Sequence, residues 1–398
     1  MQIRFLLVPL LLVSAISCTS KHGLKILLVN KYGLFEDRVQ KSLESALKWF
    51  ENAVLVNDFV ANTKFSQVRS MISGYETAVS TVTIQTPNKL FSLDVNSPEF
   101  EELFKTADHV VFIEDMKCSE NEPHAQTGSL KKASEKIPKI SLMHWCYHPV
   151  NAEFSYFDLF RHEVLHGLGY GTETSIKSLK MEEKYKWRNE DASVSEATRH
   201  SIKFNEKVLE EVRKYFECPD VKSVEVDDIG IHLNEYIFYN ELMTPSINTG
   251  VNYFSWISVA ILEQVYAEKE QVFFVNRTFV APEADAYKYA KGFGCSWLFK
   301  SCHEFLAELK ADGKERPGPF CPEYEPNAKK IKCFKNGKAY SAFDCRSQFS
   351  PAMADNGVFY SRNALYQDPV TRFCPIFQHY DQLSMYPIAD CNAPKSRK

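Results

Sequence analysis

The sequence contains, at positions 162–169, the octapeptide His162-Glu163-Val164-Leu165-His166-Gly167-Leu168-Gly169. Residues four apart share one face of an α-helix, so a helix here would direct the imidazoles of His162 and His166 toward one point. Two imidazoles at this spacing can bind one Zn²⁺, with Glu163 beside the metal, where it could hold a water molecule. The apolar run at 155–160 predicts that this helix is buried. Because glycine supplies the positive φ that a sharp exit needs, we predict that the helix ends near Gly169.

A zinc site of this kind needs a third protein ligand, and the residues leave several candidates open. The short metzincin pattern has a third histidine three residues after the glycine, where this chain has Thr172, which cannot replace it. Thermolysin-like enzymes use a downstream glutamate on a second helix instead. Glu190 is a candidate of that kind. The other possibility is a histidine that follows an insertion, and the available ones are His200, His232 and His303.

His232 stands out among these candidates because a methionine turn follows it closely. The segment after it reads Glu241-Leu242-Met243-Thr244-Pro245. A methionine in a tight turn under the zinc is the second hallmark of metzincins. The thioether of Met243 would form an apolar floor beneath the histidines.

Together these features resemble the leishmanolysin family (M8) of zinc metallopeptidases, within the metzincin clan. The motif at 162–169, the delayed His232 and the turn around Met243 carry the resemblance. Residues 107–112 resemble the family's strand before the active-site helix, and residues 289–302 resemble its glycine–cysteine segment after the turn. The family inserts a small domain between the glycine and the third histidine, and the insertion here has the same length class.

The resemblance implies a zinc-dependent endopeptidase that hydrolyses peptide bonds of protein or peptide substrates. His162, His166 and His232 would be the ligands of one Zn²⁺ per chain. Glu163 would be the catalytic base that activates a zinc-bound water. The implied fold is α+β: a metzincin-like zincin catalytic domain with a mixed sheet and an active-site helix, an inserted subdomain and a disulfide-rich C-terminal region.

The expected organisation follows the same landmarks along the chain. Strands are predicted from short apolar runs, and helices from apolar residues at helical spacing. The predicted strands lie at 23–31, 79–84 and 110–113, and the further helices at 36–52, 206–216 and 253–265. Residues 224–231 are expected to form an exposed acidic approach to His232.

A change of composition near residue 311, toward Gly, Pro, Lys and Cys, marks the last of five expected parts. These are 1–20, a signal peptide; 21–169, an N-terminal catalytic subdomain with the active-site helix; 170–231, an inserted subdomain; 232–310, the Met-turn and C-terminal catalytic part; and 311–398, a cysteine-rich C-terminal region.

The N-terminus is typical of a signal peptide. Arg4 precedes an apolar run at 5–13 that is too short for a comfortable membrane span, and small residues follow it. A bacterial lipoprotein site at Cys18 fits less well. The polar, basic tail at 392–398 lacks the hydrophobic signal of a GPI anchor. We therefore expect a secreted protein without a stable membrane anchor.

Cysteine usage agrees with a secretory route. The chain has 11 cysteines, of which Cys18 would leave with the signal peptide. Three of the others are early and seven are late, so full pairing requires at least one bridge between the groups. A second zinc site made by the late cysteines is disfavoured because they lack a C-x-x-C pair. Asn276, in Asn-Arg-Thr, is a possible N-glycan acceptor.

The remaining features limit the function classes. The formal net charge is −4, and there is no basic stripe, so nothing indicates a nucleic-acid partner. Two alternatives to the endopeptidase stay open. One is a catalytically idle secreted zinc-binding adhesion protein, although Glu163, whose loss would mark it, is present. The other is a thermolysin-type peptidase with Glu190 as the third ligand. The sequence does not indicate the oligomeric state.

Overall fold

The computed structural model describes twelve stretches of the chain, and the structural statements below concern these alone. They are residues 21–30, 35–57, 81–116, 125–129, 140–146, 155–172, 174–188, 194–247, 251–268, 272–314, 331–335 and 338–343. The predicted signal peptide, Glu190 and most of the region after residue 314 lie outside them.

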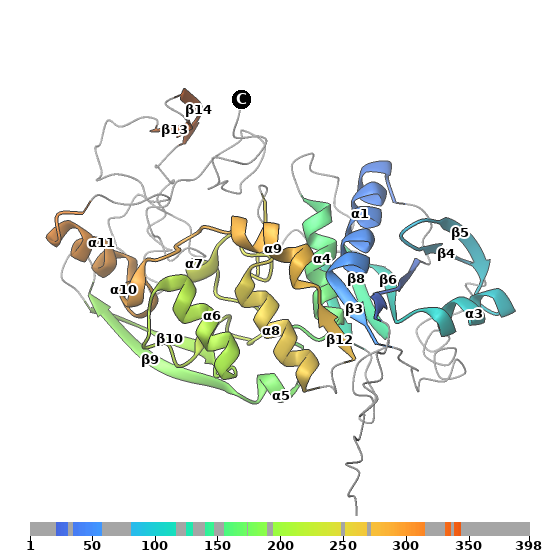
Figure 1. Cartoon of the computed structure of the whole chain (residues 1–398), viewed down its shortest axis with the longest axis horizontal. Helices are drawn as coiled ribbons and strands as arrows, with labels where there is room; N and C mark the ends of the chain where they lie inside the picture. Colours follow the sequence, from blue (N-terminus) through green and yellow to red (C-terminus); the bar gives the residue numbers. More distant parts are fainter. Residues whose placement is uncertain are drawn as a thin grey trace, which may run out of the picture.

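A six-stranded mixed sheet forms the centre of the N-terminal half (Figure 1). Its strands, in spatial order, are β5 (Leu90–Asp94), β4 (Thr81–Gln85), β2 (Ile26–Asn30), β6 (His109–Met116), β8 (Ile140–Cys146) and β7 (Ala125–Ser129). Strands β2, β6 and β8 run parallel, whereas β4, β5 and β7 pair antiparallel with their neighbours. All five residues of β2 are buried, as is typical of a strand that is covered on both faces. The predicted mixed sheet is therefore present.

Helices cover both faces of this sheet. Along β2, Leu28 belongs to a core with α1 (Asp37–Ala53) and α4 (Tyr156–Gly167). Its neighbours Leu27 and Val29 belong to a second core with α3 (Pro98–Thr106). Because successive side chains of a strand point to opposite faces, α3 packs on the face opposite to α1 and α4.

Helices dominate the second half of the described chain, on the other side of the molecule in Figure 1. They are α5 (Thr174–Lys177), α6 (Glu206–Phe216), α7 (Glu235–Phe238), α8 (Trp256–Ala267), α9 (Arg277–Ala286), α10 (Gly294–Phe299) and α11 (Cys302–Ala311). The predicted helix at 206–216 is confirmed at its predicted bounds. The helix predicted at 253–265 begins three residues later, because the Ser255 side chain accepts a hydrogen bond from the Ser258 N–H and caps its N-terminus.

Three small sheets complete the described structure. They are β1 (His22–Gly23) with β3 (Val54–Val56) and β12 (Phe273–Val275); β9 (Lys180–Arg188) with β10 (Val194–Ile202) and β11 (Val224–Val226); and β13 (Ile331–Lys335) with β14 (Lys338–Phe343). The pairing of β12 with β3 joins the two halves of the chain.

One sequence expectation fails in this part. Residues 224–231 were expected to be exposed, but Val224 and Val226 are only 1% and 4% exposed. The reason is that β11 pairs with β10, and both valines enter the core. Only Asp228 and Ile229 of this segment are exposed.

A disulfide joins Cys218 to Cys295. It connects an early cysteine with a late one, as the odd numbers in the two groups required. Within the described residues, no helix is long and apolar enough to cross a membrane.

Candidate metal centre

The helix that carries the motif is α4, and its sequence explains both of its ends. The Ser155 side chain accepts a hydrogen bond from the Asp158 N–H and caps the N-terminus. Ten consecutive residues, from Asp158 to Gly167, are buried. At Gly169 φ is +110°, and a Cβ there would lie 3.1 Å from Val265. Glycine therefore allows the chain to leave the helix sharply and pack against α8.

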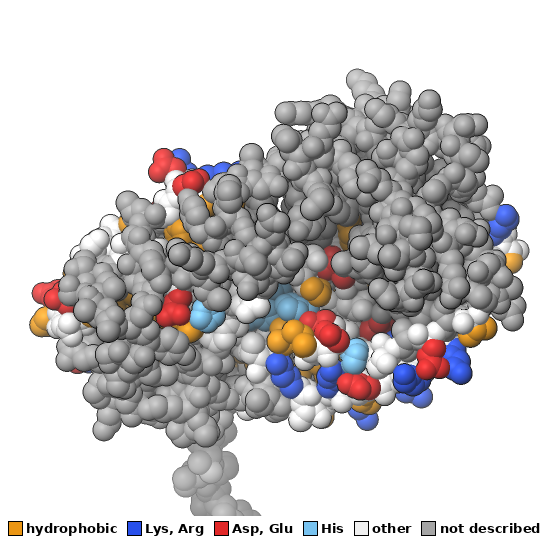
Figure 2. Space-filling model, turned by 180° about the vertical axis from the view of Figure 1, so that it is seen from behind, with side chains coloured by type: hydrophobic (Ala, Val, Ile, Leu, Met, Phe, Trp, Pro, Cys, Tyr) orange, Lys and Arg blue, Asp and Glu red, His pale blue; other side chains and the backbone are white. Residues whose placement is uncertain are grey.

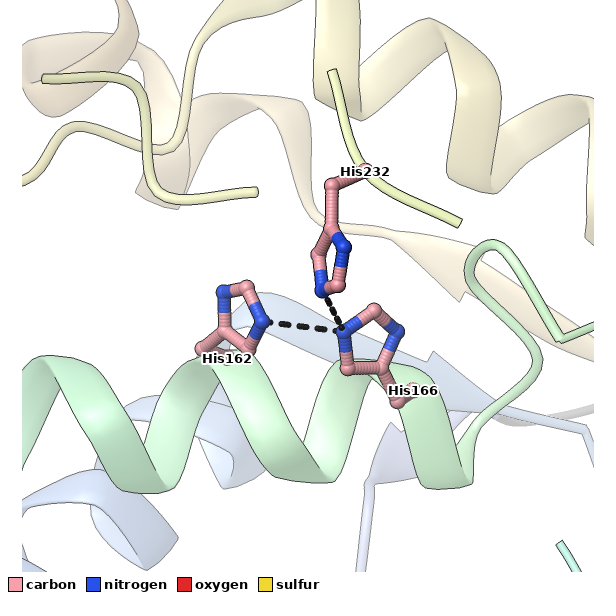
Figure 3. A group of neighbouring side chains, drawn as sticks. All are labelled: His162, His166 and His232. Atoms are coloured by element: carbon pink, nitrogen blue, oxygen red, sulfur yellow. Dashed lines mark hydrogen bonds between the residues drawn. The ribbon is translucent and has the colours of Figure 1, made fainter. Parts of the chain in front are cut away.

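Three histidines from two distant segments meet at this helix (Figure 3). His166 Nε2 lies 2.9 Å from His162 Nε2 and 3.1 Å from His232 Nε2. All three potential ligand atoms lie within 4.8 Å of one another. His162 and His166 project from one face of α4, and His232 reaches them from a loop after β11.

The opposite nitrogen of each ring has its own acceptor. His162 Nδ1 donates to the Leu242 carbonyl at 2.7 Å, and His166 Nδ1 donates to the Tyr170 carbonyl at 2.8 Å. His232 Nδ1 lies 2.7 Å from Asp227 Oδ2. Since a carbonyl oxygen can only accept, the first two rings carry their proton on Nδ1 and present a bare lone pair at Nε2 when neutral.

This donor set fits a zinc ion. Lone pairs that face one another at such distances repel, unless a cation lies among them. Zinc–nitrogen bonds of about 2.0–2.1 Å in tetrahedral geometry place two ligand nitrogens roughly 3.3 Å apart, close to the spacing around His166 Nε2. Outer acceptors on the Nδ1 atoms are also a regular feature of histidines that bind metals.

Burial keeps two of the rings in the neutral form that binds metals. It lowers the pKa of His162 to about 3, and the neighbouring His232 acts in the same direction. It also lowers the pKa of His166 well below its ordinary value. At Asp227 burial opposes ionisation, but the hydrogen bond with His232 holds the pKa of this carboxyl below its ordinary value.

Glu163 lies beside the cluster on the same helix. It is 4% exposed, and its Oε2 atom has no hydrogen-bond partner in the described part of the chain. Burial raises the pKa of Glu163 to about 7, while Thr127 of the edge strand β7 pulls it in the opposite direction. A buried carboxyl oxygen without a protein partner is available to a water molecule or a substrate.

The turn around Met243 lies directly against the cluster. Met243 is 0% exposed, and its carbonyl accepts a hydrogen bond from the Leu233 N–H at 3.0 Å, next to His232. The preceding residue, Leu242, holds the ring of His162. The backbone of the turn therefore contacts the segments that carry the histidines.

The other candidates lie elsewhere or outside the described chain. His200 is on β10, where its Nδ1 atom lies 3.5 Å from Glu182. His303 is in α11. Among the described residues, His162, His166 and His232 form the one group of histidine, cysteine and acidic side chains close enough together to hold a metal.

The possible N-glycan acceptor, Asn276, lies at the N-terminus of α9. Its side chain caps this helix, and its Nδ2 atom donates to the Asn52 carbonyl at 2.9 Å.

The histidine cluster is partly accessible from the surface, because the His232 side chain remains 17% exposed. Figure 2 shows histidine surface near the middle of one face of the molecule, beside hydrophobic and acidic side chains.

Sequence reasoning missed Asp227 and Tyr170 as partners of the histidines. The only signal for Asp227 was an acidic residue shortly before a candidate ligand. Tyr170 contributes a backbone carbonyl, which no side-chain pattern can indicate.

Comparison with known proteins supplies an independent finding. The leishmanolysin model of the M8 peptidases matches residues 111–393, well over half of the chain. Leishmanolysin-like peptidases of Drosophila pseudoobscura pseudoobscura and Drosophila melanogaster are each 26% identical over 133 residues. The aligned part is 32% of this chain but only 18% of each relative.

Proposed function

The chain belongs to the leishmanolysin family of metallopeptidases, and from this we propose that it is a secreted zinc-dependent endopeptidase that hydrolyses protein substrates. The observation that carries the proposal is the convergence of three Nε2 atoms next to a buried glutamate. Secretion rests on the sequence pattern at 1–20 alone.

His162, His166 and His232 would hold the zinc ion, which leaves one coordination position for water or substrate. A zinc ion held in this way lowers the pKa of a water molecule toward 7 and polarises a scissile carbonyl. The partners at Leu242, Tyr170 and Asp227 keep the three rings oriented.

Glu163 would move the proton. Its carboxylate would accept a proton from the attacking water and then pass it to the nitrogen of the leaving amine. Its position next to His162 on α4 suits this role, because a general base must lie within reach of the proton that it accepts. Its burial also excludes bulk water from the transfer.

An extended peptide would bind along strand β7. Among the described strands, β7 is at one edge of the six-stranded sheet. Thr127 on this strand neighbours Glu163, and the adjacent Gln126 and Gly128 are exposed. An extended peptide can add to an exposed sheet edge through main-chain hydrogen bonds. This arrangement supports peptides as the substrate class.

The test is direct. The purified protein should contain one zinc ion per chain and cleave members of a peptide library, and a chelator should abolish the cleavage. Glu163→Gln should retain zinc without turnover. Zinc-loaded wild-type protein that cleaves nothing would favour the catalytically idle reading instead.

A further inference from the structure

Glu241 is a fully buried carboxylate in the turn after His232, and the proposed reaction makes no use of it. Its exposed fraction is 0%. The Met243 N–H donates to Oε2 at 2.6 Å, and the N–H and hydroxyl of Ser255 donate to Oε1 at 3.0 and 2.9 Å. The Ser255 hydroxyl in turn accepts a hydrogen bond from the Ser258 N–H at 3.3 Å. Glu241 thus joins its own turn to the N-terminus of α8.

The bond to Met243 affects the acceptor of the first histidine. It holds the peptide between Leu242 and Met243, and the Leu242 N–H donates in addition to the Tyr253 carbonyl at 2.8 Å. The Leu242 carbonyl is thereby fixed in direction, and it is the acceptor for His162 Nδ1. Losing the Glu241 acceptor would free this carbonyl to rotate.

The contact with Ser255 links Glu241 to the second histidine, because the Ser255 hydroxyl that donates to Glu241 accepts from the Ser258 N–H. Ser258 Oγ lies 3.0 Å from the Tyr170 hydroxyl. The carbonyl of the same tyrosine accepts the hydrogen bond from His166 Nδ1. A chain of hydrogen bonds therefore runs from Glu241 to the residue that orients His166.

The turn also reaches the third histidine. The Met243 carbonyl accepts from the Leu233 N–H at 3.0 Å. Leu233 directly follows His232. The N–H of Met243 is therefore bonded to Glu241, and the carbonyl of Met243 is bonded to the segment that carries His232.

We propose that Glu241 is a positioning residue, which holds the backbone that orients all three histidines and so sets the geometry of the metal centre. This inference rests on the proposed function, because it takes the cluster to bind zinc. A carboxylate suits the position since it only accepts hydrogen bonds, and its surroundings offer donors. In Glu241→Gln an NH₂ group would face one of these donors at nearly unchanged volume.

The experiment measures zinc affinity by competition with a chromophoric chelator, at fixed pH, in wild type, Glu241→Gln and Glu283→Gln. Glu283 is a matched control because it also joins several elements. It accepts from Arg161 at 2.7 Å, from the Trp49 ring at 3.2 Å and from the Phe254 N–H at 2.9 Å. None of these donors belongs to a residue that accepts from a histidine Nδ1.

Both variants should lower the melting temperature, but only Glu241→Gln should weaken zinc binding, by about tenfold or more. The visible absorption spectrum of the Co²⁺-substituted protein should change in the same variant alone. Equal losses of affinity in both variants, or a Glu241→Gln affinity within about twofold of wild type, would overturn the inference.

If Glu241→Gln does not fold, Tyr170→Phe tests the same inference. This variant removes the hydroxyl that contacts Ser258 and keeps the carbonyl that accepts from His166. It should weaken zinc binding several-fold, with no further loss on adding Ser258→Ala. Unchanged affinity in Tyr170→Phe would overturn the inference. A wild-type chain that binds no zinc would overturn the proposed function as well, so the two failures are distinguishable.

Discussion

His162 Nδ1 donates a hydrogen bond of 2.7 Å to the carbonyl oxygen of Leu242, 80 residues further along the chain. This bond connects α4 to the turn around Met243. Two motifs that the sequence presents separately are therefore parts of one structural unit. The turn thus contributes to the cluster through its backbone, because the Leu242 carbonyl orients the ring of a proposed zinc ligand.

The identity of the third ligand can be tested first. His232→Ala removes one of three converging nitrogens, and we expect zinc affinity to fall by more than about 100-fold, because even the loss of an outer partner costs 10–100-fold. His200→Ala is the matched control, since this histidine lies on β10 beside Glu182. Zinc per chain after dialysis is the measurement. Retention of zinc by His232→Ala but not by Glu190→Ala would favour the thermolysin-type alternative.

The role of Glu163 is tested by Glu163→Gln, which keeps the shape of the side chain but removes its basicity. We expect kcat to fall by about 10²–10⁴-fold, the usual contribution of a general base, while one zinc ion per chain is retained. Turnover of a peptide substrate and metal content should be measured on the same sample. Normal cleavage by this variant would show that another group accepts the proton.

The sequence predicted local elements well and long-range contacts poorly. The helix at 206–216 could be predicted from its own apolar spacing, because residues within one helix set that pattern. The burial of β11 could not be predicted in this way, because it depends on pairing with β10 from another part of the chain. For the same reason Asp227 and the Tyr170 carbonyl were missed. The meeting of His232 with α4 was predicted, first from the methionine turn that follows His232 and then from the family resemblance.

Glu163 also predicts how the stability of the metal-free protein depends on pH. Burial raises its pKa from 4.5 to about 7. Between these values the folded chain holds a proton that the unfolded chain has lost, so this group stabilises the fold as the pH falls toward 4.5. Above pH 7 both states are ionised and the buried carboxylate is unfavourable.

We therefore expect chelator-treated Glu163→Gln to unfold less easily than chelator-treated wild type at pH 8. At about 1.4 kcal/mol per pH unit, this advantage should shrink by about 3 kcal/mol between pH 7 and 4.5. Urea unfolding of both proteins across this range is the measurement. A difference that does not change with pH would contradict the raised pKa.

Gly171 offers a test of whether the close contact between the segment that follows α4 and the His232 segment contributes to the proposed metal centre. Its φ is +66°, and a Cβ there would lie 2.1 Å from the carbonyl oxygen of Ile231, the residue before His232. Gly313 has the same φ of +66° with nothing within 4 Å of a Cβ, so Gly313→Ala isolates the backbone strain, about 1–3 kcal/mol. Gly171→Ala must in addition push the Ile231 peptide away, which would displace His232 from the other two rings. We expect both variants to lose stability in urea unfolding, and Gly171→Ala alone to lose about tenfold or more in zinc affinity. If both variants bound zinc as tightly as wild type, the fit between these two segments would not contribute to the metal centre.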